Sequence, residues 1–79
     1  MTTLPADEDY AKGLLSIFRA KGVRAGESLR AGQVVLEFEL RNLGRPADYE
    51  AALSYAAERG WLRLELGHIR LTEAGAAES

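Results

Sequence analysis

The sequence predicts a small α+β domain in which helices come first and a two-stranded hairpin comes near the C-terminus. Two segments carry apolar residues at helical spacing, and each ends at a glycine. A later segment, WLRLELGHIRLT, alternates aliphatic and charged residues on both sides of a central glycine, as the strands of a hairpin do. These two patterns define the elements around which the rest of the chain is interpreted.

The composition is that of one ordinary globular domain. The chain has 79 residues, of which 47% are hydrophobic and 28% charged. A domain of this size buries only about 60% of its unfolded surface, so the core is thin. There is no cysteine and only one histidine, His68, so neither disulfides nor a zinc site is expected, and no motif indicates a cofactor.

The charge and hydropathy patterns exclude some classes of partner. The apolar runs are only a few residues long, too short to span a membrane. The first ten residues, MTTLPADEDY, lack the apolar core of a signal peptide, so a cytoplasmic location is expected. The net charge of −2 argues against unspecific binding to polyanions, although a local basic stripe is compatible with it.

The first helix is expected over residues 6–21. Acidic residues fill its first turn, where they suit the positive end of the helix dipole, and Lys21 and Gly22 form a stop signal. Its apolar stripe consists of Tyr10, Leu14, Ile17 and Phe18. Residues 23–31 are predicted to be a loop, with a short third strand near Ser28 to Arg30.

The next segment, GQVVLEFELRNLG, fits two interpretations. Val34, Leu36, Phe38 and Leu40 alternate with polar residues, as in a strand. Leu36, Leu40 and Leu43 also follow helical spacing, and leucine, glutamate and glutamine favour helices. In a helix, the leucine stripe is expected to face the core and to leave Val34 and Phe38 on the opposite side. The residues themselves leave helix or strand open for residues 33–42.

Residues 46–59 predict a second clear helix, with Pro46 at its first position and Gly60 after its end. Its inner face is expected to contain Tyr49, Ala52, Leu53 and Ala56. Trp61, at the junction between this helix and the hairpin, is expected to fill the core.

The hairpin is expected to turn at Gly67 and His68, because glycine first suits a type II′ turn. Leu66 then pairs with Ile69, Glu65 faces Arg70, and opposite charges meet on one side. Five aliphatic residues share the other face and cover the helices: Leu62, Leu64, Leu66, Ile69 and Leu71. Thr72 is expected to cap a short closing turn or helix.

Over residues 49–75, YEAALSYAAERGWLRLELGHIRLTEAG, the chain resembles the third helix and wing of bacterial winged helix-turn-helix regulators. This resemblance implies that GQVVLEFELRNLG is the second helix, and hence a three-helix bundle with a C-terminal hairpin as one domain over residues 1–79. It also implies sequence-specific DNA binding in transcription control, with the third helix as recognition helix beside the wing, often in a dimer.

The resemblance identifies candidate DNA-binding residues before, on and after the third helix: Arg45, Ser54, Tyr55, Arg63, His68 and Arg70. Base edges are commonly read by Arg, Lys, Asn or Gln. The outward side of the third helix carries none of these, and Asp48 and Glu50 have the wrong sign for phosphate. The charges therefore favour a protein partner.

Val34, Val35 and Phe38 are the candidate protein-interaction residues. Either they form an exposed apolar patch for a protein partner or a second copy, or they pack under the first helix or the 23–31 loop. We therefore expect a non-catalytic binding module in a regulatory role, and the alternative is a DNA-binding transcriptional regulator. No nucleophile–base pair, nucleotide-binding motif or small-molecule site is evident, so an enzyme is not expected.

Overall fold

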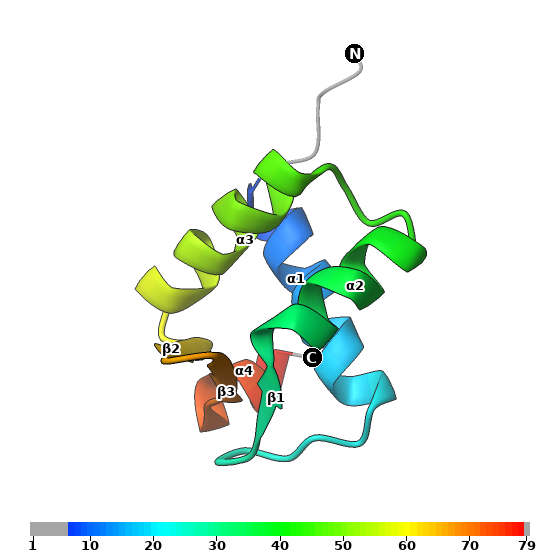
Figure 1. Ribbon diagram of the computed structural model, residues 1–79. Coiled ribbons are helices and arrows are strands. Elements are labelled where there is room, and N and C mark those ends of the chain that lie inside the picture. Colours follow the sequence, from blue (N-terminus) through cyan, green and yellow to red (C-terminus); the bar gives the residue numbers. More distant parts are fainter. Residues whose placement is uncertain (1–6, 79) are drawn as a thin grey trace.

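The computed structural model describes residues 7–78, and over this range the predicted α+β class is confirmed. Helices surround a core that a small antiparallel sheet closes (Figure 1). The predicted start of the first helix at residue 6 and the expectation for the first residues of the chain lie outside the described residues. The elements are α1 (Asp7–Ala20), β1 (Ser28–Arg30), α2 (Ala31–Leu40), α3 (Pro46–Glu58), β2 (Leu62–Glu65), β3 (His68–Leu71) and α4 (Glu73–Glu78).

The core lies where α1 packs against α3 and α2. The apolar stripe predicted for α1 is largely inside, since Leu14, Ile17 and Phe18 are fully buried. On α3 the small residues Ala52 and Ala56 are also fully buried, which lets α3 approach α1 closely. The complete buried set is Ala11, Leu14, Leu15, Ile17, Phe18, Val34, Phe38, Tyr49, Ala52, Ala56, Trp61, Leu62, Ile69 and Leu71.

The segment that fitted both helix and strand is a helix, α2, but the face predicted to enter the core is wrong. Val34 and Phe38 are fully buried, whereas Leu36 and Leu40 are 53% and 66% exposed. The Phe38 ring lies edge-on to Tyr49 of α3, with 5.5 Å between the ring centroids. Burying the large aromatic ring and the β-branched Val34 against α1 and α3 leaves the two leucines toward solvent.

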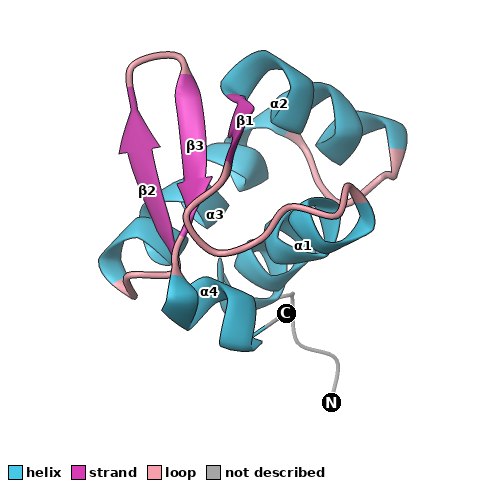
Figure 2. Cartoon of the chain, turned by 90° about the horizontal axis from the view of Figure 1, so that it is seen from below, coloured by secondary structure: helices cyan, strands magenta, loops and turns pink. Residues whose placement is uncertain are grey.

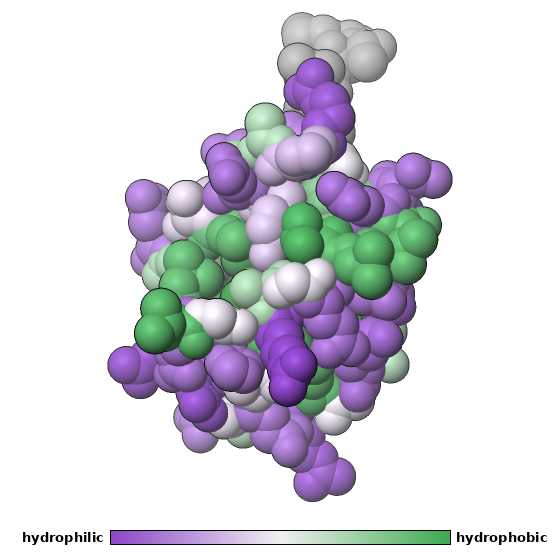
Figure 3. All heavy atoms as spheres, in the orientation of Figure 1, coloured by the Kyte–Doolittle hydropathy of each residue, from purple (hydrophilic) through white to green (hydrophobic). Residues whose placement is uncertain are grey.

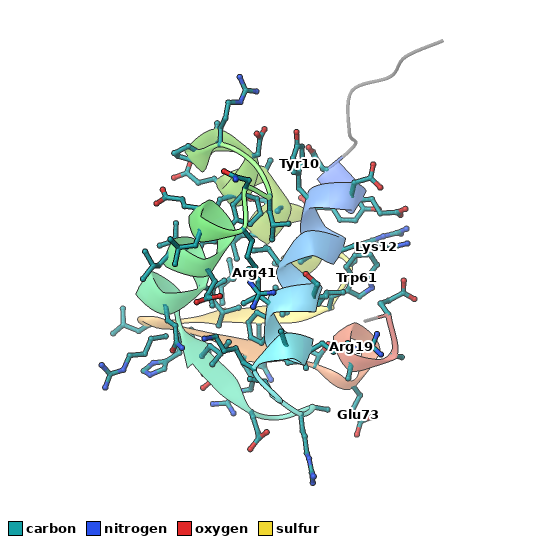
Figure 4. All side chains as sticks on the ribbon, turned by 90° about the vertical axis from the view of Figure 1, so that its right-hand side faces the viewer. Tyr10, Lys12, Arg19, Arg41, Trp61 and Glu73 are labelled. Atoms are coloured by element: carbon teal, nitrogen blue, oxygen red, sulfur yellow. The ribbon has the colours of Figure 1, made fainter. Side chains whose placement is uncertain are left out.

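An ion-pair cluster also fixes α2 against α1. Glu37 of α2 accepts a hydrogen bond from Nε of Arg41 at 3.0 Å and pairs with Nζ of Lys21, just after α1, at 3.4 Å. Arg41 lies between the two helices in Figure 4. The hydrogen bond from Arg41, aided by Lys21, lowers the pKa of Glu37. The Arg41–Glu37 pair lies along α2 itself, so the contact that depends on the orientation of α2 is the Lys21–Glu37 pair.

The three strands form an antiparallel sheet in the order β1-β3-β2 (Figure 2). The short strand expected at residues 28–30 is present as β1, and it pairs with β3 rather than with the strand nearest in sequence. Its pairing brings the chain directly into α2, since Ala31 N–H donates to the Gly67 carbonyl at 3.0 Å.

The hairpin register differs from the prediction by two residues. Leu64 pairs with Ile69 and Glu65 with His68, so the turn consists of Leu66 and Gly67. Gly67 has φ of 77°, and a positive φ at the second central position is the feature of a type II turn, not of II′. A shift of two residues keeps the side chains of residues 62–65 and 69–71 on their predicted faces, because strand side chains alternate with period two.

The predicted leucine cover is therefore only partly correct. Leu62, Ile69 and Leu71 are buried over the helices, but Leu64 is half exposed and Leu66 fully exposed. Both lie at the turn end of the hairpin, which extends past the helices. The predicted Glu65–Arg70 pair does form, with Nε and Nη2 of Arg70 donating to the carboxylate at 2.9 and 3.0 Å.

Trp61 and Thr72 close the domain between α3 and α4. Trp61 is buried, as expected, and its carbonyl accepts hydrogen bonds from the Thr72 hydroxyl at 2.8 Å and from the Thr72 N–H at 3.1 Å. Thr72 also caps α4, because its Oγ1 accepts a hydrogen bond from Gly75 N–H at 3.0 Å. Across the described residues, no helix is long and apolar enough to cross a membrane.

Candidate binding surface

Two groups of exposed leucines are the most unusual surface feature. Leu36 and Leu40 lie one turn apart on α2, on the side that faces away from the core. Leu64 and Leu66 lie at the turn end of the β2–β3 hairpin. Figure 3 shows hydrophobic side chains gathered over α2 and over the hairpin on one face of the molecule, with polar and small residues between them.

The predicted protein-interaction residues are not this surface. Val34 and Phe38 are in the core, and Val35 packs against the core with partial exposure. These three residues take the alternative outcome considered for them, packing inside the protein. The sequence analysis assigned Leu36 and Leu40 to the core instead. The leucine stripe of α2 competes for burial with the stripe of Val34 and Phe38. The second stripe is buried, and its Phe38 ring packs against Tyr49 of α3.

The outward side of α3 carries no cation, because the helix PADYEAALSYAAE contains none. Ser54 is exposed there, together with Glu50 and Glu58. Tyr55, predicted to point outward, instead turns toward the start of α1, where its hydroxyl donates to Glu8 at 3.0 Å. Its ring also lies edge-on to Trp61 and beneath the Arg59 guanidinium, at 5.7 and 5.4 Å. Tyr55 therefore joins α1 to α3 and is not available to a partner as predicted.

Arg45 precedes α3, and its side chain is 84% exposed. Its backbone N–H donates to Asp48 Oδ2 at 2.8 Å, and its Nε donates to the same oxygen at 3.3 Å. The backbone hydrogen bond and then the guanidinium contact lower the pKa of Asp48, which stays ionised and stabilises the first turn of α3. Asp48 thus reduces the positive charge that Arg45 offers to an anion.

Asp48 should make the stability of α3 depend on pH. Its pKa is lowered in the folded chain, so its stabilising contribution is complete above the ordinary value of 3.8 and is lost as the pH falls through the lower folded value. We expect Asp48→Asn to lower the urea midpoint at pH 7 and to differ less from the native protein as the pH falls below 3.8. Urea unfolding of both proteins between pH 7 and pH 2 measures this, and a gap that is constant with pH would contradict it.

The remaining candidate cations lie on the outer face of the sheet. Arg63 and Arg70 are directly opposite each other on β2 and β3, and His68 is exposed beside the turn. Arg70 is engaged by Glu65 and also donates to the Gly26 carbonyl. The hydrogen bonds from Arg70 lower the pKa of Glu65, so this pair stays charged. Arg63 forms no ion pair within residues 7–78, and it is the exposed cation of the hairpin.

An open hollow of about 270 Å³ lies beside these arginines, lined by Ala25, Gly26, Arg63, Arg70, Leu71, Thr72 and Glu73. Glu73 offsets part of its positive charge. Within the described part of the chain, no three His, Asp or Glu side chains gather where they could hold a metal ion. The structure therefore brings Arg63, Arg70 and His68 together on the sheet, while Arg45 directly precedes α3 and Ser54 lies on it.

The fold is winged-helix-like in its order: a helix, a short strand, two helices and a hairpin that pairs with the short strand. No family model matches the chain, and no curated protein or solved structure is similar to it at a significant level.

Proposed function

We propose that this protein is a non-catalytic, winged-helix-like module that binds another protein in a regulatory setting. One observation carries the proposal: Leu36 and Leu40, on the same side of α2, are exposed by 53% and 66%. Exposed leucines that lie together on one element are typical of protein-interaction surfaces. The composition of α3 supports the same choice, since this helix contains none of the Arg, Lys, Asn or Gln residues that commonly read base edges.

The surface of α2 fits a partner that offers an apolar face with a few basic or neutral rim residues. Glu39 and Gln33 are exposed beside the leucines, so the patch has a polar, acidic border. An apolar centre within a polar rim is the usual organisation of a protein interface.

A test compares three immobilised proteins for what they retain from a cell extract: the native chain, Leu36→Gln with Leu40→Gln, and Arg45→Ala with Arg63→Ala. We expect the native chain and the arginine variant to retain the same protein, and the leucine variant to lose it. Both leucines are exposed, so the leucine variant should keep its fold, and circular dichroism verifies this. Equal retention by all three proteins would refute the role of α2.

Duplex DNA is the second candidate, favoured by the winged-helix-like order and by the exposure of Arg45 and Arg63. If the chain binds duplex DNA, its affinity should fall as the salt concentration rises and should fall when either arginine is replaced. Each replacement should reduce the slope of log affinity against log salt concentration by about one. Titration of labelled duplexes at low salt with the same three proteins decides between the two. Binding lost only in the arginine variant would replace the protein-binding proposal with this one.

A further inference from the structure

The outer edge of the sheet is formed by β2, whose backbone is open to pairing with another strand. In the order β1-β3-β2, β2 has a strand on one side only. Figure 2 shows it as the outermost strand, with no other described element beside its outer side at the turn end of the hairpin. Natural edge strands are protected from further pairing by being very short or by carrying charged side chains, above all lysine, or proline, a bulge or an inward charge. The run LRLEL, residues 62–66, has no proline or lysine, and its two charged residues, Arg63 and Glu65, are of opposite sign.

The backbone of Leu64 points toward this open edge. Leu71 of β3 bonds toward the β1 side: its N–H donates to the Glu27 carbonyl at 2.9 Å, and its carbonyl accepts from the Gly26 N–H at 2.8 Å. Neighbouring residues of a strand in an antiparallel sheet bond in opposite directions, so Arg70 bonds toward β2. Arg63, its partner, therefore bonds toward β3, and Leu64 directs its N–H and carbonyl away from the sheet.

The run is also complementary to itself when reversed. If two copies pair antiparallel with Leu64 opposite Leu64, then Arg63 lies opposite Glu65 and Leu62 opposite Leu66. Residues directly opposite in an antiparallel pair share a face, so both Arg–Glu pairs fall on the outer face and the two Leu64 side chains on the inner one; Leu66, the first residue of the turn, comes next to Leu62 of the other copy. Arg63, which has no ion pair within residues 7–78, thereby faces Glu65 of the second copy, a carboxylate that also accepts hydrogen bonds from Arg70 of its own copy, and Leu64 gains an apolar neighbour.

We propose that two copies of this chain associate through their β2 strands, with a two-fold axis at Leu64, to form one continuous six-stranded antiparallel sheet. This interface is isologous, since each copy contributes the same strand and the same charges. It is separate from the α2 surface proposed above and does not depend on it. An interface made by a single short strand is small, so the dimer forms at high concentration.

Sedimentation velocity of the native protein, from roughly 10 µM to 1 mM, tests for the dimer across the range in which small interfaces are populated. We expect the sedimentation coefficient to rise with concentration toward that of a dimer. Raising the protein concentration over the same range should slow hydrogen exchange at the Leu64 amide, because its N–H faces solvent in the monomer and is hydrogen-bonded in the dimer. A monomer throughout this range would overturn the proposal.

Leu64→Pro is the sharpest variant. Proline removes only the N–H that faces the open edge, so edge strands tolerate it while further pairing is blocked. We expect a folded monomer at all concentrations, with folding checked by circular dichroism. Leu40→Ala is the control, and it should dimerise like the native protein. A dimer lost in Leu40→Ala and kept in Leu64→Pro would place self-association on α2 and overturn the β2 pairing.

Charge exchange gives a second, independent readout. Arg63→Glu places like charges opposite each other twice, and we expect it to weaken the dimer roughly tenfold. Adding Glu65→Arg restores opposite charges across the two-fold axis and should recover most of the loss. If Leu64→Pro does not fold, this pair still decides the question: a double variant that dimerises no better than Arg63→Glu would refute the predicted register.

Discussion

Replacing Phe38 with alanine is expected to lower the free energy of unfolding by about 3–5 kcal/mol. Its side chain is fully buried, lies edge-on to Tyr49 and is close to Gly44. A chain of 79 residues has a total stability of about 4–12 kcal/mol, so this single change removes a large part of it. Urea unfolding followed by the fluorescence of Trp61, the only tryptophan, measures the loss.

Leu40→Ala is the matched control for Phe38→Ala, since it truncates a large apolar side chain two residues further along the same helix. The Leu40 side chain is 66% exposed, so it buries little apolar surface on folding. We therefore expect its truncation to lower the free energy of unfolding by less than about 1 kcal/mol. If Leu40→Ala were as destabilising as Phe38→Ala, α2 would have to turn its leucine face inward, contrary to the structure.

Replacing Gly75 with alanine is expected to cost about 1–3 kcal/mol by forcing extra volume into a filled site. A Cβ on Gly75 would lie 2.1 Å from the Trp61 carbonyl oxygen and 3.0 Å from Cδ1 of Leu71. The Trp61 oxygen is backbone and is held by two hydrogen bonds from Thr72, so no side-chain rotation relieves the contact. The remaining response is displacement of α4 from Trp61 and α1.

Gly32→Ala makes the same substitution as Gly75→Ala but is expected to raise stability instead of lowering it. Gly32 lies in α2 with no atom within 4 Å of its added Cβ, and its φ is not positive. Alanine there should raise stability by up to about 1 kcal/mol, because it restricts the unfolded chain and favours the helix. The midpoint temperature of thermal unfolding should rise in Gly32→Ala and fall in Gly75→Ala, relative to the native protein. A Gly75→Ala protein as stable as Gly32→Ala would show that α4 does not pack as described.

The candidate surface was less accessible to prediction than the elements. Arg63 and Ser54 are exposed where the sequence placed them, because both follow from the local period of their own strand or helix. Tyr55 was misplaced because its position depends on Glu8, which is 47 residues away in the chain. Arg70 was assigned to a partner, yet its guanidinium donates a hydrogen bond to the carbonyl of Gly26, in the loop between α1 and β1. Contacts at such separations leave no periodic signal in a sequence.

The sequence by itself determined the helices α1 and α3 and the presence of the hairpin. Their signals are local: acidic residues, Pro46 or a glycine at the ends, and a period of 3.6 or 2 between them. The side of each hairpin residue was determined in the same way, so even a register shifted by two residues kept Leu62 and Ile69 inside.

Only the tertiary structure decided which face of α2 is buried. Two apolar stripes compete on this helix, and both satisfy its local rules. The choice depends on what lies opposite: Tyr49 receives the ring of Phe38, and the Lys21–Glu37 pair forms on that side alone. The packing of large side chains and the pairing of charges across elements thus place Leu36 and Leu40 on the surface, where the binding function is proposed.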